Sequence, residues 1–153
     1  MEVIIRSVCV ICVVLLICDL ASAQREKSVL LPQSEAHSLA EQCSRTNPPE
    51  FNETWQPTEA AIKDMESKFS RIAECCEEGT RFDDPEDSYM QYVGIIVKGR
   101  KLIYINAFPF VGELFKDWKE RAVRVCDGGS GFWGVLYDTE TGKFFDLAVN
   151  GLP

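Results

Sequence analysis

Apolar residues in the middle of this chain recur with the period of an α-helix. Between residues 57 and 79 they are spaced by three and four positions, which places them along one side of a helix. They are Ile62, Met65, Phe69, Ile72 and Cys76. Thr58 is a suitable N-cap, and Gly79 suits the end of the helix. The pattern predicts one amphipathic helix of about twenty residues.

The segments after this helix are rich in β-branched and aromatic residues. The predicted strands are 89–97, 102–108, 122–126, 132–137 and 144–149. Gly99 suits the first central position of a type II′ turn between the first two. The last two would be joined across residues 138–142. The expected fold is α+β, with one long amphipathic helix packed on an antiparallel sheet of about five strands.

The start of the chain carries a different pattern. A short charged beginning leads into an apolar run from Val8 to Cys18, followed by Ala21-Ser22-Ala23. Signal peptidases cleave after such small-x-small patterns, and the run is too short to span a bilayer. We therefore expect a signal peptide over 1–23, an irregular arm over 24–56 and an α+β domain over 57–153. The mature protein would be periplasmic or secreted, without stable membrane insertion after cleavage.

Charge narrows the class of partner. The chain has a formal net charge of −8 and a pI near 4.7. Loss of Glu2, Asp19 and Arg6 with the signal would leave −7. Nucleic acids and anionic membranes attract clustered Lys and Arg, so neither is expected as the main partner.

Signal cleavage also changes the cysteine count. Of seven cysteines, Cys43, Cys75, Cys76 and Cys126 would remain. Exported domains with four cysteines usually form two disulfides, and the spacing here lacks the close pairs of a zinc site. The helical stripe points Cys76 at the sheet, so the predicted bridges are Cys76–Cys126 and Cys43–Cys75.

Catalytic chemistry has little support in the sequence. His37, the only histidine, lies in the polar arm and is expected to be solvated. The glycine-rich stretch 126–131 lacks the Lys-Ser/Thr ending of a phosphate loop. Asp127 and Asp138 are the candidates for a small carboxylate-dependent hydrolase, which we keep as an alternative. No catalytic residue and no cofactor are assigned.

For two further features, the alternative to a functional role is simple exposure to solvent. The acidic stretch Asp83, Asp84, Glu86 and Asp87 offers oxygen ligands for calcium, but it lacks the glycine-centred calcium-loop pattern. A solvated loop is the preferred interpretation, and no metal site is assigned. Asn52-Glu53-Thr54 is a glycosylation sequon that has meaning only in a eukaryote.

Aromatic residues near the predicted turns are the best candidates for a binding surface. They are Phe110, Trp118, Phe132 and Trp133. Large aromatic side chains at loop edges often anchor protein interfaces. The alternative is a second small core beneath residues 109–120.

Parts of the second half resemble a family of short exported bacterial proteins of uncharacterised function. The resemblance is carried by Tyr89–Gly94, Leu102–Phe108, Cys126–Gly129, Phe132–Val135, Tyr137-Asp138 and Val149–Gly151. It implies an envelope location and no catalytic residues. A looser topological likeness to cystatin-like domains implies no protease inhibition, because Gln91-Tyr92-Val93-Gly94 departs from the inhibitory Gln-x-Val-x-Gly pattern.

The leading hypothesis is an exported, non-enzymatic binding module with a protein partner, such as an inhibitor or an envelope accessory protein. A carboxylate-dependent hydrolase and a structural partner subunit are the alternatives.

Overall fold

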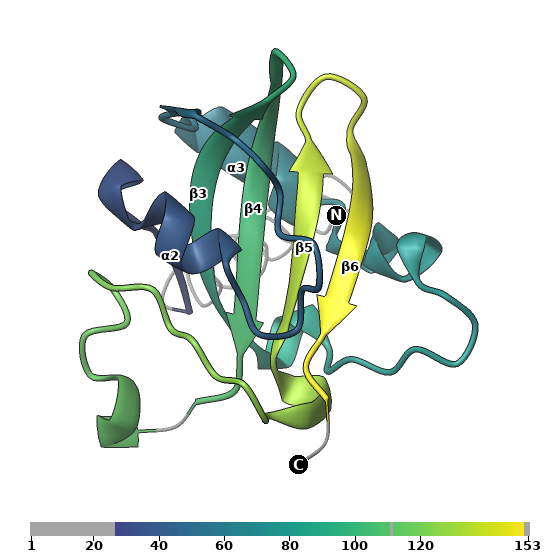
Figure 1. The fold of residues 1–153 in the computed structure, drawn as a ribbon. Helices are drawn as coiled ribbons and strands as arrows, with labels where there is room; N and C mark the ends of the chain where they lie inside the picture. Colours follow the sequence, from purple (N-terminus) through teal and green to yellow (C-terminus); the bar gives the residue numbers. More distant parts are fainter. Residues whose placement is uncertain (1–26, 111, 152–153) are drawn as a thin grey trace, which may run out of the picture.

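A six-stranded sheet forms the centre of the molecule (Figure 1). The computed structural model describes residues 27–110 and 112–151, so the predicted signal peptide lies outside the described residues. The strands are β1 (Ser28–Leu30), β2 (Glu53–Trp55), β3 (Tyr89–Val97), β4 (Arg100–Phe108), β5 (Trp133–Asp138) and β6 (Lys143–Val149). Their order is β1-β3-β4-β5-β6, and β2 pairs with β3 as well. The α+β class is confirmed.

The strands from β3 to β6 form an antiparallel meander, whereas β1 runs parallel to β3. A two-residue turn joins β3 to β4, and Lys98 and Gly99 both have positive φ (50° and 79°). Positive φ at both central positions is the signature of a type I′ turn, so the type II′ prediction is wrong.

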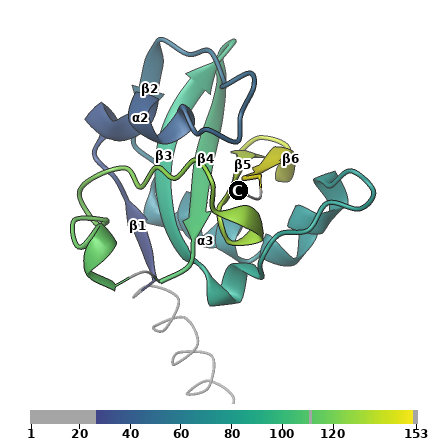
Figure 2. The same cartoon turned by 60° about the horizontal axis from the view of Figure 1, so that its bottom comes forward.

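Helical segments cover both faces of the sheet (Figures 1 and 2). The α-helices are α2 (Ala36–Ala40) and α3 (Glu59–Glu66), and the 3₁₀ segments are η1 (Gln33–Glu35), η2 (Phe69–Cys75), η3 (Pro85–Asp87), η4 (Gly112–Phe115) and η5 (Gly129–Gly131). Met65 and Ile72 pack from α3 and η2 against one face. Ala36 and Leu39 pack from α2 against the other. The sheet therefore has two cores, one on each side.

The predicted long helix is two short pieces. α3 ends at Glu66, and the hydroxyl of Ser67 donates to the Asp64 carbonyl. Serine competes for backbone groups in this way and weakens a helix. The chain continues as the 3₁₀ segment η2, which has three residues per turn rather than 3.6. Phe69, Ile72 and Cys75 therefore face the core, and the prediction that Cys76 points at the sheet is wrong.

The predicted irregular arm contains the strands β1 and β2 and the helix α2. β1 and β2 lie along the same edge of β3, and α2 is buried through Ala36, Leu39 and Ala40. Between α2 and β2, residues 41–52 cross the face of the sheet (Figure 1). The boundary predicted at residue 56 therefore divides a single folded unit.

Arg45 holds this crossing segment on the sheet. Its side chain is only 1% exposed, and it makes four hydrogen bonds. Nε donates to the Tyr104 hydroxyl at 3.0 Å, and Nη1 contacts the Asp146 carboxylate at 2.5 Å. Nη2 donates to the carbonyl oxygens of Gly134 and Asp146, at 3.0 and 2.7 Å.

Three of the four acceptor atoms belong to Gly134 and Asp146, in an irregular part of the β5–β6 pair. The register shifts between Gly134 and Leu136, and Asp146 has a φ of 55°. A Cβ at residue 134 would collide with the Tyr104 hydroxyl, so only glycine leaves room for this network. Arg45 thus supplies donors to carbonyl oxygens at the place where the register shifts.

We expect Arg45→Met to lower the free energy of unfolding by about 2–4 kcal/mol, because the buried Tyr104 hydroxyl and Gly134 carbonyl lose their donor. Urea unfolding of purified protein measures this. Arg124→Met, at an exposed position, is the matched control and should change stability by less than about 0.5 kcal/mol. Equal stability of the two variants would contradict the role given to Arg45.

Candidate functional site

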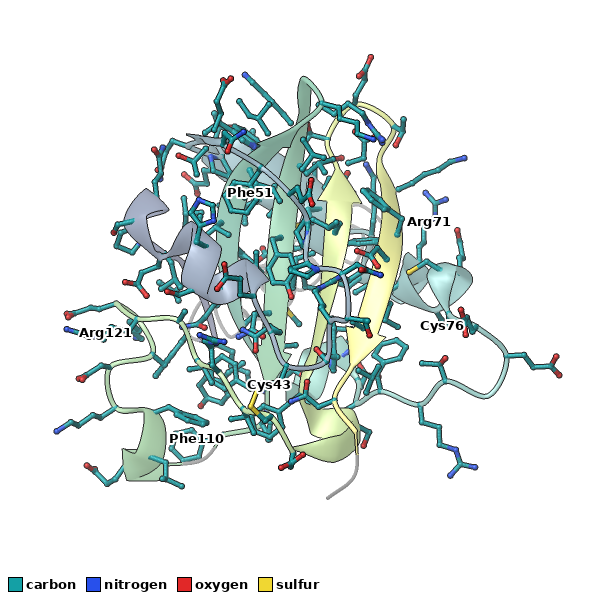
Figure 3. All side chains as sticks on the ribbon, viewed as in Figure 1. Cys43, Phe51, Arg71, Cys76, Phe110 and Arg121 are labelled. Carbon is teal, nitrogen blue, oxygen red and sulfur yellow. A yellow bond between two sulfur atoms is a disulfide. The ribbon has the colours of Figure 1, made fainter. Side chains whose placement is uncertain are left out.

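Residues 109, 110 and 112–121, which follow β4, form a surface segment that we call the aromatic loop. It carries Phe110 and Leu114, which are 69% and 81% exposed and are the large hydrophobic side chains most open to solvent among the described residues. Phe110 and Arg121 lie on the same side of the molecule, beside the sheet at the lower left of Figure 3. Exposure of two large apolar side chains on one loop marks a candidate binding surface.

Phe110 packs against an aromatic cluster. Tyr89 lies at the centre, with its ring centroid 5.3 Å from those of both Phe110 and Trp118. Phe108 contacts Trp118 and Phe115 edge to face, at 5.9 and 6.0 Å. The loop is therefore supported by ring contacts to the ends of β3 and β4.

Buried amides hold the segment after η4 against the sheet. Gln91 Nε2 donates to the carbonyl oxygens of Trp118 and Arg121, at 2.5 and 2.6 Å, and its Oε1 accepts from Val123 N at 2.8 Å. Asn106 lies opposite Gln91 in the register and donates to both Gln91 Oε1 and the Val123 carbonyl. These bonds replace the strand predicted over 122–126, because side chains rather than a neighbouring strand satisfy its backbone.

A disulfide joins the same segment to the crossing arm. The structure links Cys43 to Cys126 and leaves Cys75 and Cys76 free, so the predicted bridges Cys76–Cys126 and Cys43–Cys75 are wrong. The adjacent Gln42 donates to the Val123 carbonyl at 3.1 Å. The error follows from the α-helical period assumed for residues 69–76, which placed Cys76 on the buried side.

The four aromatic residues predicted as a binding surface do not lie together on it. Trp133 is 1% exposed and belongs to the core on the α3 side, where Phe82 packs edge to face against it at 5.3 Å. Phe132 is half-buried beside Gly128. Phe110 is exposed, and Trp118 is half-buried beneath it. Leu114, which is 81% exposed, was missed because all of the predicted binding residues are aromatic.

Charged side chains surround a small cavity beside Leu114. The cavity has a volume of about 330 Å³, and its walls include Trp118, Arg121 and Arg124. Neither arginine forms an ion pair with another described residue, whereas Lys119 lies 5.4 Å from the Trp118 ring centroid. An apolar centre with a charged rim is the usual anatomy of a protein interface.

The two carboxylates considered for hydrolysis lie far apart. Asp127 precedes β5 and is exposed, whereas Asp138 is the last residue of β5. The length of β5 separates them by on the order of 15 Å. Asp138 pairs with Arg100 and accepts from the backbone N–H groups of Glu140 and Thr141. It caps the β5–β6 turn, and the two carboxylates do not form a shared site.

The other sequence candidates have structural roles. Asp84 caps η3 through Glu86 N, and Asp83 accepts from the Ser130 hydroxyl at 2.8 Å. Residues 27–110 and 112–151 contain no group of three or more His, Cys, Asp or Glu residues placed to hold a metal ion. His37 is exposed and stacks on Phe51, with ring centroids 4.4 Å apart, at one side of a groove of about 1080 Å³.

A second polar cluster ties α3 to β5. Lys68 Nζ donates to Asp64 at 2.7 Å and to the Tyr137 hydroxyl at 2.9 Å, and Tyr137 donates to Asp64 at 2.5 Å. The hydrogen bond from Lys68 lowers the pKa of Asp64, whereas burial and the Asp64 carboxylate raise the pKa of Tyr137. The phenol therefore stays protonated, which suits a structural contact better than proton transfer.

Stability separates the buried from the exposed aromatic residues. Trp133→Ala should lower the free energy of unfolding by about 3–5 kcal/mol, because it empties a core position. Phe110→Ala should change it by less than about 0.5 kcal/mol, because the side chain is mostly exposed. Urea unfolding of both variants tests the assignment, and a large loss for Phe110→Ala would place that ring in the core.

Asp138 should make stability depend on acid. Burial raises the pKa of Asp138, but hydrogen bonds from Arg100 and the Glu140 backbone outweigh burial and leave the pKa below 3.8. The carboxylate thus stabilises the fold above the unfolded pKa near 3.8, and this contribution is lost as the pH falls through the lower folded value. Asp138→Asn should be less stable than wild type at neutral pH, with the gap closing in acid.

Urea unfolding at neutral and acidic pH measures that gap. Asp127→Asn makes the same chemical change at an exposed position and serves as control. A gap for Asp138→Asn that is constant with pH would contradict the capping role.

Comparisons with known proteins give no evidence about the function of this chain. Within the described ranges, none of the helices has the length and apolarity needed to cross a bilayer. The resemblances to exported bacterial proteins and to cystatin-like domains stay predictions. No protein-family model, curated protein or solved structure matches this chain.

Proposed function

We propose that this protein is an exported, non-enzymatic binding module and that its partner is another protein. The observation that carries the proposal is the aromatic loop, on which Phe110 and Leu114 stand out into solvent. Folded proteins rarely leave such side chains uncovered together without a use. Aromatic anchors within a charged rim favour a protein partner over a small polar ligand.

Rigidity of the loop supports the same proposal. Gln91 binds the loop backbone at Trp118 and Arg121, while Asn106 and the Cys43–Cys126 disulfide fix the residues that follow the loop. A loop that is already ordered loses less conformational entropy on binding. These contacts therefore favour recognition by a preformed surface.

The compartment is part of the proposal. The signal-like residues 1–23 and the disulfide both fit a periplasmic or secreted protein, because disulfides persist in oxidising surroundings. A role as an inhibitor or an envelope accessory protein fits such a location. The separated carboxylates give the hydrolase alternative no comparable support.

The test uses peptides displayed on phage as a defined probe. Peptides selected on immobilised wild-type protein are measured against Phe110→Ser/Leu114→Ser. We expect the double variant to bind at least about thirtyfold more weakly, because each anchor of an interface contributes more than about 1 kcal/mol. Fluorescence anisotropy with labelled peptides gives the dissociation constants.

Val97→Ser is the matched control. It replaces a half-buried apolar residue at the opposite end of β3 and should leave peptide affinity unchanged. The proposal fails if no peptides are selected, or if those selected bind the double variant as tightly as wild type.

A further inference from the structure

Among the residues that the structure describes, Cys75 and Cys76 are the cysteines outside a disulfide. They end η2 beside β6, and Cys76 lies well apart from Cys43 (Figure 3). Both are half-buried, and Cys75 packs at the margin of the core on the α3 side. Two adjacent thiols are therefore held at the surface with no cysteine partner elsewhere in the described chain.

The two sulfur atoms converge on one backbone oxygen. Cys75 Sγ donates to the Ile72 carbonyl at 3.0 Å, and Cys76 Sγ approaches the same oxygen at 3.9 Å. Both sulfur atoms therefore lie near the same backbone oxygen at the end of η2.

Backbone N–H groups lie close to the Cys75 sulfur. Burial and the nearby Cys76 raise the pKa of Cys75, and burial raises the pKa of Cys76, so a metal ion must displace both protons. The backbone N–H groups of Leu147 on β6 and of Cys75 itself oppose the rise at Cys75 only in part. Backbone N–H groups directed at sulfur are a common outer shell of metal-bound thiolates.

The number of donors selects the kind of metal. Residues 27–110 and 112–151 bring no third His, Cys, Asp or Glu into a metal-binding group with these thiols. Zinc requires about four ligands and calcium six to eight, so two sulfurs satisfy neither. Soft thiolates select Cu(I), which accepts two ligands in a linear arrangement.

We propose that Cys75 and Cys76 form a two-thiolate site for a soft monovalent cation of the Cu(I) class. Binding breaks two S–H bonds, forms two metal–sulfur bonds and releases two protons to solvent. No electron is transferred. The site is separate from the aromatic loop and does not depend on the proposed function.

The experiment titrates the purified protein under anaerobic conditions, in a background of Cys9→Ser, Cys12→Ser and Cys18→Ser that removes competing thiols. Ag(I) serves as a redox-inert probe, and Cu(I) is supplied against a chromophoric Cu(I) chelator of known affinity. We expect one equivalent to bind, with ultraviolet thiolate-to-metal absorption. Loss of one thiol should weaken binding at least about a hundredfold, because the second sulfur acts at high effective concentration.

Two single-cysteine variants distinguish loss of a metal ligand from loss of the fold. Cys76→Ser is the primary one, because Cys76 does not pack against the core, and Cys75→Ser is the second, with circular dichroism reporting the fold of each. Glu77→Gln, next to the pair, controls for simple charge and should bind like the background protein. Unchanged affinity of Cys76→Ser, independent binding of two cations, or no binding at all would overturn the proposal.

Discussion

The guanidinium of Arg45 brings a positive charge into the interior and is held there by four hydrogen bonds. A buried charge is tolerated only when its partners satisfy it, so the sheet must present its acceptors in the right place. It does so where the β5–β6 register shifts, with Gly134 leaving room for Tyr104. This contact draws residues 41–52 across the sheet, and the covering of that face depends on it.

The same crossing segment reaches the candidate binding surface. Gln42 and Cys43 precede Arg45 and contact the segment that follows the aromatic loop, through the Val123 carbonyl and the disulfide to Cys126. Gln91 and Asn106 complete this support from within the sheet. The same contacts thus hold the arm on the sheet and support the aromatic loop, which carries the exposed Phe110 and Leu114.

Much of the central architecture follows from local patterns. The strands β3, β4, β5 and β6 and both of their turns were expected, because β-branched runs and glycine turns act over short distances. The apolar stripe through Met65 and Ile72 was also found, although the helix breaks at Ser67. Phe110 and Trp133 were both predicted as binding residues, since both are aromatic residues near turns. The sequence did not show that Phe110 is exposed and Trp133 is buried.

Taken alone, the sequence determined the α+β class, the hairpin strands and the side of α3 that is buried, because these depend on residue periods within a few positions. Tertiary structure decided which cysteines pair, how the arm folds and which aromatic residues reach solvent. The 3₁₀ period of η2 turns Cys75 rather than Cys76 to the core, and the buried Arg45 pulls the arm across the sheet. Both depend on contacts between residues far apart in the chain, which no local pattern encodes.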